Sequence, residues 1–368
     1  MSAITTIDVF GYQLTYAHGE YVMSSGRAAT AQDSTMIRIS CADGSYGWGE
    51  VCTLAGTYWP AFAGGARAAL QEFGPALLGV DGTNLGAVHA AMESVLMGHA
   101  YAKSAVDIAC WDLLGKKAGL PLHELLGGRM QSDFPLYEAV PLASPDAMAS
   151  FVKERSAAGI TAFQVKVGND PAEDAQRLHA VAEVAPDGTT LIADANGGWT
   201  LQQAVQAVRL IDGLPIYLEQ PCARVEDCAH VRRLTTLPMV MDESVITATD
   251  LVSVKNDLGA GSVNLKLGRL GGITGMRTMR DLAVSMGMSV SLEDAWGGDV
   301  TTAAVSHLAA TTPAESLLSV SFFNDWTNEH VAGYLPRSAF GRGSAPTAPG
   351  LGIEVDADLL GQPLFTIA

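Results

Sequence analysis

The chain has 368 residues, 48% of them apolar, and a formal net charge of −17 at pH 7. This acidity argues against nucleic acid as a partner, because phosphate binding relies on Lys and Arg. Since no apolar run reaches the roughly 20 residues of a membrane span, and the N-terminus lacks a secretory signal pattern, the sequence predicts a soluble, cytoplasmic enzyme subunit with two domains, one of them barrel-sized.

The first third of the chain predicts an α+β domain. Residues 4–52 alternate apolar and polar positions and contain turn signals such as Asp43-Gly44, which is typical of a β-meander. From Trp59 to Leu126 the pattern becomes helical, with Ala-rich amphipathic stretches such as residues 102–116. We therefore place the first domain over residues 1–130. The five scattered cysteines, without CxxC spacing, are expected to be reduced and mostly buried.

From Phe134 onward, strand and helix patterns alternate. Eight strands, the number that closes a (β/α)₈ barrel, are expected near Tyr137, Val165, Ala193, Leu218, Val240, Leu265, Ser291 and Val320. The fold class is therefore α/β, with the barrel over residues 131–326. The tail, residues 327–368, is rich in Gly, Pro and Ser and is expected to return to the first domain.

Three acidic segments each follow a run of β-formers and recur about every 25 residues, the length of one βα unit. They are Asp194-Ala-Asn196, Leu218-Glu219-Gln220 and Met241-Asp242-Glu243. This period places Asp194, Glu219 and Asp242 at the C-terminal ends of three adjacent parallel strands, where barrel enzymes keep their chemistry. Three converging carboxylates need a cation, and their oxygen ligands favour Mg²⁺ over zinc. The alternative is that each acid caps the helix that follows it.

The same period includes two lysines, in Gln164-Val-Lys166 and Asn264-Leu-Lys266. Alternate residues of a barrel strand point inward, so Lys166 and Lys266 are expected to flank the metal as two potential bases. Burial and a nearby divalent ion both disfavour an ammonium group, so both should lower the pKa of these lysines. Alone, Lys166 would equally suit a solvated strand end.

The order of these motifs resembles a known family. The chain combines the helix 102–116 and Leu125-Leu-Gly-Gly128 with Lys166-Val-Gly168, Asp194-Ala-Asn196, Glu219-Gln-Pro221, Asp242-Glu243 and Lys266. Together they resemble the mandelate racemase and muconate lactonising group of the enolase superfamily, over nearly the whole chain. The resemblance implies that the α+β domain caps a modified (β/α)₈ TIM barrel. It also implies one Mg²⁺ per subunit on Asp194, Glu219 and Asp242, and a homo-oligomer, either a dimer or an octamer.

The expected chemistry begins with removal of a proton next to a carboxylate. This step places two negative charges on an ene-diolate, which Mg²⁺ stabilises, while Lys166 or Lys266 takes the proton; this is a known pattern of enolase-superfamily sites. Return of a proton to the other face gives racemisation or epimerisation, and a neighbouring hydroxyl allows loss of water. Two other classes remain open: a Schiff-base aldolase, which does not need the three acids, and a catalytically silent barrel.

Two departures from the family pattern are informative: the first, at Gln164, leaves more of the activation of Lys166 to Mg²⁺ and burial, and the second, near Glu293, narrows the substrate class. Many lysine-based members carry Lys-x-Lys where this chain has Gln164 before Lys166. The run from Glu293 to Asp299 resembles the subgroup that acts on proline derivatives, namely 4-hydroxyproline betaine epimerases and cis-3-hydroxy-L-proline dehydratases. Asp294 would then meet the substrate ammonium, although it could instead orient Lys266. The Trp296 side chain would pack against the ring of the substrate, although Trp296 could instead be a buried turn residue.

The choice within that subgroup depends on how the substrate nitrogen is held. A quaternary nitrogen is usually bound by an aromatic cage, for which Tyr58, Trp59 and Trp296 are candidates. A secondary ammonium donates hydrogen bonds to carboxylates, for which Asp294, Asp299 and Asp325 are candidates. We favour dehydration of cis-3-hydroxy-L-proline to a pyrroline-2-carboxylate, with proline betaine or 4-hydroxyproline betaine epimerisation as the alternative.

The remaining expectations concern the surroundings of the site. Gln164 and Asn196 complete the expected substrate-binding set of Asp294, Trp296 and Tyr58. The loop of residues 20–27, which includes Tyr21 and Arg27, is the candidate lid. His99 is expected to be structural.

Overall fold

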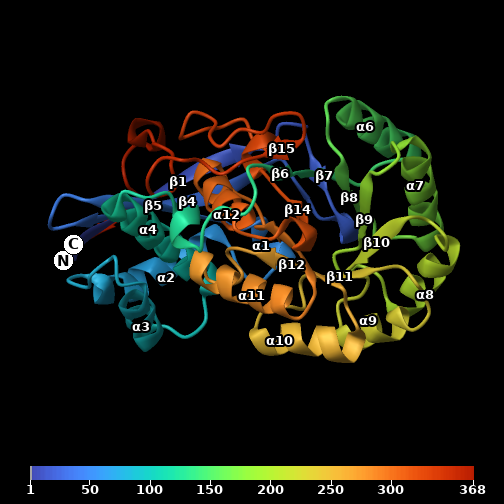
Figure 1. Cartoon of the computed structure of the whole chain (residues 1–368), viewed down its shortest axis with the longest axis horizontal. Coiled ribbons are helices and arrows are strands. Elements are labelled where there is room, and N and C mark those ends of the chain that lie inside the picture. Colours follow the sequence, from blue (N-terminus) through green and yellow to red (C-terminus); the bar gives the residue numbers. More distant parts are fainter. Residues whose placement is uncertain (1) are drawn as a thin grey trace.

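A computed structural model describes residues 2–368 of the chain (Figure 1). The N-terminal meander forms an antiparallel sheet in which β1 (Ile4–Thr15) pairs with β4 (Ala31–Cys41), and β4 pairs with β5 (Tyr46–Cys52). The last strand, β16 (Phe365–Ile367), pairs with the other edge of β1. The two ends of the chain therefore lie side by side in the first domain (Figure 1).

Two helices pack on this sheet, α2 (Ala63–Phe73) and α4 (Ala100–Ala118), and α3 (Leu85–Val95) packs against both of them. The longest, α4, lies so close to β5 that a Cβ atom on Gly47 or Gly49 would come within 2.0 Å of a helix carbonyl oxygen. Only glycine allows this approach. The helix ends at Gly119, which takes the left-handed conformation with φ of 67° that favours glycine after a helix C-terminus.

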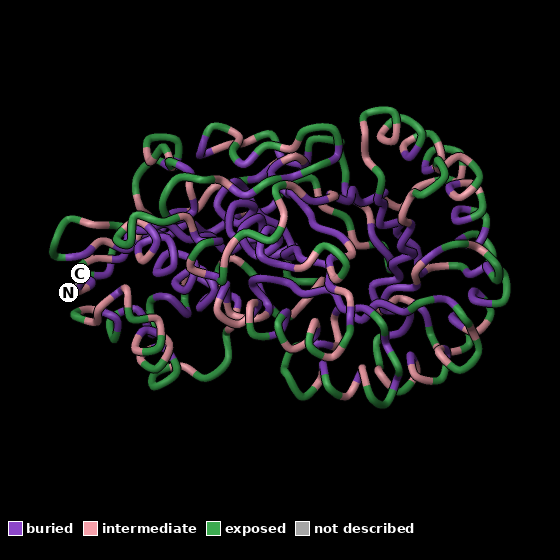
Figure 2. The backbone as a smooth tube through the Cα atoms, viewed as in Figure 1, coloured by how far each residue is buried: buried purple, intermediate pink, exposed green. Residues whose placement is uncertain are grey.

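Eight parallel strands form the second domain, and each predicted strand position falls in one of them. Their order in the sheet follows the chain, and a parallel bridge between Leu136 and Val320 joins the last strand to the segment before the first. Figure 2 shows that these strands are buried while the outer helices expose one side. The strands are β7 (Tyr137–Val140), β8 (Ala162–Lys166), β9 (Thr190–Asp194), β10 (Ile216–Glu219), β11 (Met239–Met241), β12 (Ser262–Lys266), β13 (Ser289–Glu293) and β14 (Leu317–Val320).

A helix follows each barrel strand from β7 to β13, whereas in the described residues β14 leads into a 3₁₀ turn, Phe323–Trp326. The barrel is thus modified, which explains why the sequence pattern blurs after Phe322. The helices are α6 (Pro145–Ala157), α7 (Pro171–Val184), α8 (Leu201–Leu210), α9 (Val225–Arg232), α10 (Ala248–Ser253), α11 (Ile273–Ser285) and α12 (Asp299–Ala310).

Short elements connect and cover the two domains. They are β2 (Tyr21–Val22), β3 (Ala28–Ala29), α1 (Ala55–Tyr58), α5 (Leu122–Leu125), β6 (Phe134–Pro135) and β15 (Arg342–Gly343). All five cysteines are buried and carry free thiols. Over residues 2–368, no helix combines the length and the apolar character that crossing a membrane requires.

Candidate active site

The predicted catalytic and metal-binding residues meet at one end of the barrel. Lys166, Asp194, Glu219 and Lys266 are the last residues of β8, β9, β10 and β12, and Asp242 directly follows β11. Because the strands are parallel, these residues share the C-terminal mouth. None of the five is more than 5% exposed to solvent. Their charges are therefore held in a largely water-free environment.

The acids do not cap the following helices. The helix after Asp194, α8, is capped by Thr200, whose side chain accepts a hydrogen bond from the backbone N–H of Gln203. The helix after Asp242, α10, is capped in the same way by Thr247. The helix after Glu219 has no side-chain cap. The helix-cap interpretation is therefore excluded, and the burial of these three carboxylates needs another reason.

On one side of the mouth, Lys166 is held between an amide and an acid. Its Nζ atom lies 2.5 Å from Oδ2 of Asp194 and donates to Oε1 of Gln164 at 2.7 Å. The Gln164 amide in turn donates to Glu219 at 3.0 Å. Burial alone would lower the pKa of Lys166, but Asp194, Tyr21 and Glu219 hold it above its ordinary value. This is the opposite of the expected lowering, because carboxylates are the charges nearest to the ammonium.

On the other side, Lys266 forms an ion pair with Glu293 at the end of β13, and its Nζ atom lies 3.3 Å from Oδ2 of Asp242. The Asn264 amide donates to both Glu219 and Glu293, at 2.8 and 2.6 Å. Burial, and secondarily the charge of Asp294, raises the pKa of Glu293 well above its ordinary value. The sequence reasoning quoted Glu293 only as part of a motif and did not identify it as the partner of Lys266.

Asp242 is held by two further donors. The Arg269 guanidinium lies 2.6 Å from its Oδ1 atom, and the Tyr58 hydroxyl donates to Oδ2 at 3.0 Å. Burial would raise the pKa of Asp242, but Lys266 and Arg269 hold it below its ordinary value. The role of Arg269 was missed from the sequence. The only available signal was its position three residues after Lys266.

The donor chemistry of the mouth fits a divalent cation. Burial raises the pKa of Glu219 well above its ordinary value, and the charges of Asp194 and Asp242 raise it further, so this group favours a proton or a cation beside it. Two buried oxygens, Oδ1 of Asn196 and Oε2 of Glu243, have no hydrogen-bond partner among the residues that the structure describes. Within residues 2–368, however, no three acids, histidines or cysteines already surround one point as ligands. Lys166, Tyr58 and Arg269 occupy oxygens that a cation would take.

Asn196 is shaped by the same cluster. Its backbone adopts a φ of 45°, and its side-chain amide donates to Asp194 at 2.8 Å and to Glu243 at 3.1 Å. Burial raises the pKa of Glu243 to about 7, and the charge of Asp242 adds to the effect. Glu243 is therefore a second acid that the sequence reasoning did not single out.

A small cavity lies between the two lysines. It measures about 20 Å³, close to the space of one water molecule, and both lysines line it. Tyr21, Tyr58, Phe323 and Asp294 form part of its wall. Gln164 and Asn196 line it as well. A substrate fits only when part of this wall moves.

Asp294 is the one acid of the proposed ammonium-binding group in this cavity wall. Its carboxylate accepts backbone hydrogen bonds from Gly268 at 3.0 Å and from Ala295 at 2.7 Å. Burial raises its pKa to about 7. Lys266 is oriented by Glu293, not by Asp294. The side chain of Asp294 is therefore fixed by backbone donors, without a cationic partner within ion-pair distance in the described residues.

Three other predicted contacts lie elsewhere. Trp296 does not line the cavity but packs behind it, stacked on Phe323 and edge-on to Tyr21. It is 1% exposed, as a buried turn residue would be. Asp299 accepts from Asn324 and from the backbone of Ala332, at the start of α12.

Asp325 does not line the cavity between the lysines either. Burial raises its pKa, while Ser338 and Tyr334 lower it as hydrogen-bond donors. Tyr21 and Phe323 therefore occupy the wall expected for Trp296, and Asp299 and Asp325 connect elements of the fold.

The loop of residues 20–27 reaches the barrel mouth. It contains β2 and a 3₁₀ turn (Ser24–Gly26) and leads into β3, and the Val22 carbonyl accepts a hydrogen bond from the backbone N–H of Leu142. Arg27 donates to the backbone oxygen of Asn196 at 3.4 Å. His99 lies in the capping domain, at the start of α4. The loop thus covers one side of the cavity, and His99 does not line it.

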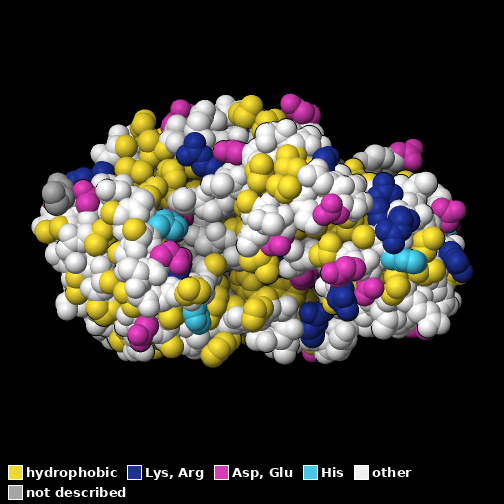
Figure 3. Space-filling model, turned by 90° about the horizontal axis from the view of Figure 1, so that it is seen from below, with side chains coloured by type: hydrophobic (Ala, Val, Ile, Leu, Met, Phe, Trp, Pro, Cys, Tyr) yellow, Lys and Arg dark blue, Asp and Glu magenta, His cyan; other side chains and the backbone are white. Residues whose placement is uncertain are grey.

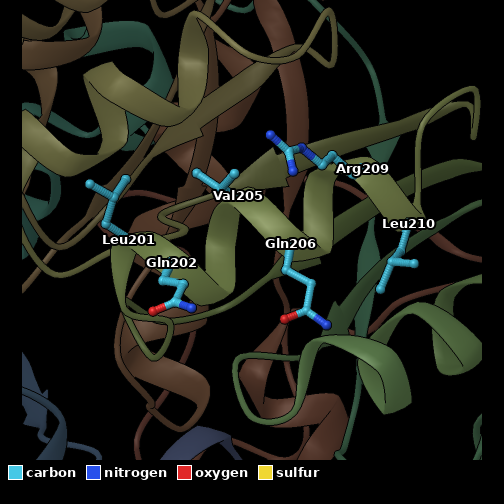
Figure 4. Close-up of a pocket in the computed structure, with 6 residues that line it drawn as sticks. All are labelled: Leu201, Gln202, Val205, Gln206, Arg209 and Leu210. Atoms are coloured by element: carbon cyan, nitrogen blue, oxygen red, sulfur yellow. The ribbon is translucent and has the colours of Figure 1, made fainter.

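A separate surface depression of about 720 Å³ lies over α8 (Figure 4). Figure 4 shows the lining side chains projecting from one helix. They are Leu201, Gln202, Val205, Gln206, Arg209 and Leu210. No carboxyl, thiol, hydroxyl or imidazole group is among them, so this depression offers no acid–base chemistry.

Comparisons with known proteins agree with this geometry. The family model of the mandelate racemase/muconate lactonizing enzyme N-terminal domain matches residues 8–127, and that of the enolase C-terminal domain-like family matches residues 147–359. Cis-3-hydroxy-L-proline dehydratase from Roseibium aggregatum is 41% identical over 98% of each chain. N-succinyl-L-Arg/Lys racemase from Bacillus cereus is 28% identical over 97% of this chain and 96% of that protein.

A solved structure shares the whole fold. A member of the enolase superfamily from Roseovarius nubinhibens ISM, complexed with magnesium, superimposes with a TM-score of 0.93 at 34% identity and covers 100% of both chains. The predicted resemblance and fold are therefore confirmed.

Proposed function

The chain belongs to the mandelate racemase/muconate lactonizing enzyme family of the enolase superfamily, and we propose that it is a hydro-lyase that dehydrates cis-3-hydroxy-L-proline. The product would be a pyrroline-2-carboxylate. One observation carries the proposal: two buried lysines on β8 and β12 line one cavity whose wall also presents Asp294. Two lysines can manage the two proton movements of a dehydration, and Asp294 can meet a ring ammonium. The 41% identical dehydratase supports the same substrate.

The proposal includes one Mg²⁺ per subunit, with Asp194, Glu219 and Asp242 as the protein ligands. The excess of buried carboxylates at the mouth, and the raised pKa of Glu219, support this assignment. The bound ion would supply positive charge for the negative charge that develops on the substrate carboxylate. Family members bind magnesium, as the related structure from Roseovarius nubinhibens does.

The protein's own groups would then move the protons. One lysine takes the α-proton, and the lysine across the cavity is placed to protonate the departing 3-hydroxyl group, so that water leaves. Gln164 holds Lys166 and Glu293 holds Lys266, so both lysine side chains are already in position when the substrate binds. The residues around the lysines leave only about 20 Å³ of open space, so a substrate that displaces part of this wall would leave little room for bulk water beside the reacting carbon.

Asp294 distinguishes this substrate from the alternative. A secondary ammonium can donate to this carboxylate, whereas a quaternary nitrogen has no N–H group and needs an aromatic cage. The cavity wall also presents Tyr21, Tyr58 and Phe323, so a betaine epimerase remains the second candidate. The displacement of Trp296 from the wall removes one ring from that cage. The balance therefore favours the amino acid.

The test is proton NMR in D₂O with Mg²⁺, offering cis-3-hydroxy-L-proline and 4-hydroxyproline betaine in parallel. We expect loss of the hydroxyproline signals and growth of a pyrroline carboxylate. Exchange of the α-proton of the betaine with formation of a second diastereomer, and no dehydration, would instead establish the epimerase. Borohydride trapping of a covalent adduct with a carbonyl substrate would point to Schiff-base chemistry. Cation binding without turnover or exchange of either compound would contradict both proposals.

A further inference from the structure

A second cavity adjoins the catalytic one, on the other side of Tyr58. This outer cavity, which we call the antechamber, measures about 510 Å³ and lies between the capping domain and the barrel. The capping domain contributes Tyr58, Trp59 and the segment 97–101, and the barrel contributes Glu243, Ile246 and Arg269. Tyr58 lines both cavities. Tyr58 is therefore shared by a large outer cavity and a small inner one.

The polar groups of the antechamber belong to the same network as the inner site. Arg269 pairs with Asp242 and also lies 5.7 Å from the ring centre of Trp59. Glu243 accepts a hydrogen bond from Asn196 through one oxygen, while its other oxygen is buried and unpartnered. The indole N–H of Trp59 is also buried and lacks a partner in the described residues. One donor and one acceptor are thus left unused beside a guanidinium.

The rim of the antechamber is apolar and open. Met97 is 88% exposed and Ile246 is 55% exposed. Figure 3 shows apolar side chains gathered in the middle of the face seen from below. An exposed apolar rim around a few convergent polar groups is typical of a ligand-binding cleft.

We propose that the antechamber is the access route and first binding site of the substrate amino acid, and that Tyr58 is the gate to the catalytic cavity. The inference rests on the proposed function for the substrate class, a small cyclic amino acid. The substrate carboxylate accepts from the Arg269 guanidinium and the ammonium donates to the Glu243 carboxylate, and the Trp59 indole turns its unpartnered N–H toward the substrate on binding. The apolar rim contacts the ring carbons. Rotation of Tyr58 breaks its hydrogen bond to Asp242 and opens the inner cavity.

The first experiment obstructs the route without touching the lysines or the acids. Ile246→Trp enlarges a side chain on the rim, and Leu234→Trp makes the same change at a site that is 48% exposed and outside both cavities. With magnesium and cis-3-hydroxy-L-proline, we expect Ile246→Trp to lower kcat/KM about tenfold with kcat within twofold, because encounter is slowed and chemistry is not. Leu234→Trp should match the parent. Equal kcat/KM for the two variants would overturn the proposal.

The second experiment does not depend on turnover. Trp59 is partly exposed, whereas the other five tryptophans are buried, so quenching of fluorescence by acrylamide reports mainly on the antechamber. Saturating L-proline, which lacks the hydroxyl that leaves, should halve the quenching slope, and Trp59→Phe should abolish the difference. No protection by L-proline would contradict first binding in the antechamber. Protection without dehydration of hydroxyproline would overturn the proposed function alone.

Discussion

The two sides of the catalytic cavity repeat one pattern with one difference. On β8 an amide precedes the lysine by two residues, as Gln164 and Lys166, and on β12 the same spacing gives Asn264 and Lys266. Each lysine pairs with the acid opposite it on the next strand, Asp194 or Glu293. Glu219 lies between the two sides and accepts from both amides.

The difference lies in the acids. Asp194 belongs to the proposed magnesium ligands, whereas Glu293 does not. Gln164 also accepts a hydrogen bond from Lys166, while the Asn264 oxygen is buried and finds no partner within the described part of the chain. The acid paired with Lys166 is therefore itself a proposed cation ligand, whereas the acid paired with Lys266 is not, and Lys266 meets the proposed cation site only through Asp242, 3.3 Å from its Nζ atom. The repeated pattern accounts for the two proton-transfer groups. The difference means that each lysine is paired with an acid of a different kind.

Removing each lysine is expected to have the largest effect. Lys166→Ala and Lys266→Ala should each lower kcat for dehydration about 10³-fold, because each deletes one proton-transfer group. Proton NMR in D₂O then separates their roles: the variant that lacks the base loses α-proton exchange, and the other retains it. Lys153→Ala, at an exposed position on α6, is the control. Equal exchange of the α-proton by both variants would contradict the assignment of one lysine as the base and the other as the acid.

Neutralising the two acids tests the difference directly. Asp194→Asn should lower kcat about 10³-fold and weaken magnesium binding measured by calorimetry, since it removes a ligand and the partner of Lys166. Glu293→Gln should lower kcat about tenfold and leave the magnesium affinity within twofold. A comparable loss of affinity in both variants would mean that Glu293 belongs to the cation site.

Much of this arrangement could be predicted from the sequence. The period of about one βα unit located all eight strands, and it placed Lys166, Asp194, Glu219, Asp242 and Lys266 at one mouth. The roles of these residues stay predictions. The period alone indicates at which end of its strand a residue lies. The C-terminal ends of adjacent parallel strands lie side by side, so residues at those ends are expected to be neighbours.

The remaining contacts depend on how the chain turns after each strand. Trp296 follows β13 by three residues, and the bend there directs the indole behind Phe323 instead of into the cavity. Arg269 returns from the turn after β12 to the neighbouring Asp242, a contact that its position three residues after Lys266 does not by itself identify. Glu293 became the partner of Lys266 through the register of β12 and β13, which a single sequence does not reveal.

A third prediction concerns the acid next to Glu293. Asp294 has backbone donors but no cationic partner, and burial raises its pKa to about 7. The folded protein therefore holds a proton that the unfolded chain releases near pH 4. Stability should be lost as pH rises through this window, by about 2 kcal/mol between pH 5 and 7. Asp294→Asn should reduce this loss, seen as a Tm advantage over the parent that grows between pH 5 and 7. A constant difference in Tm would mean that Asp294 is ionised throughout.

The smallest expected effect concerns the two tyrosines that face the lysines. The Tyr21 ring centre lies 5.9 Å from Nζ of Lys166, and the Tyr58 ring centre lies 5.5 Å from Nζ of Lys266. Phenylalanine keeps either ring and removes only the hydroxyl. Tyr58→Phe deletes the donor to Asp242, so we expect kcat to change about threefold together with a small rise in magnesium affinity, because that oxygen becomes free.

Tyr21→Phe provides the matched comparison, since its hydroxyl does not hydrogen-bond to Asp242. Its kcat should change by about the same factor, while the magnesium affinity measured by calorimetry stays at the parent value. A rise in affinity in Tyr21→Phe equal to that in Tyr58→Phe would show that the capping domain acts on the cation site as a whole. A rise confined to Tyr58→Phe would assign the coupling to the single contact between Tyr58 and Asp242, the contact that has to break when the gate opens.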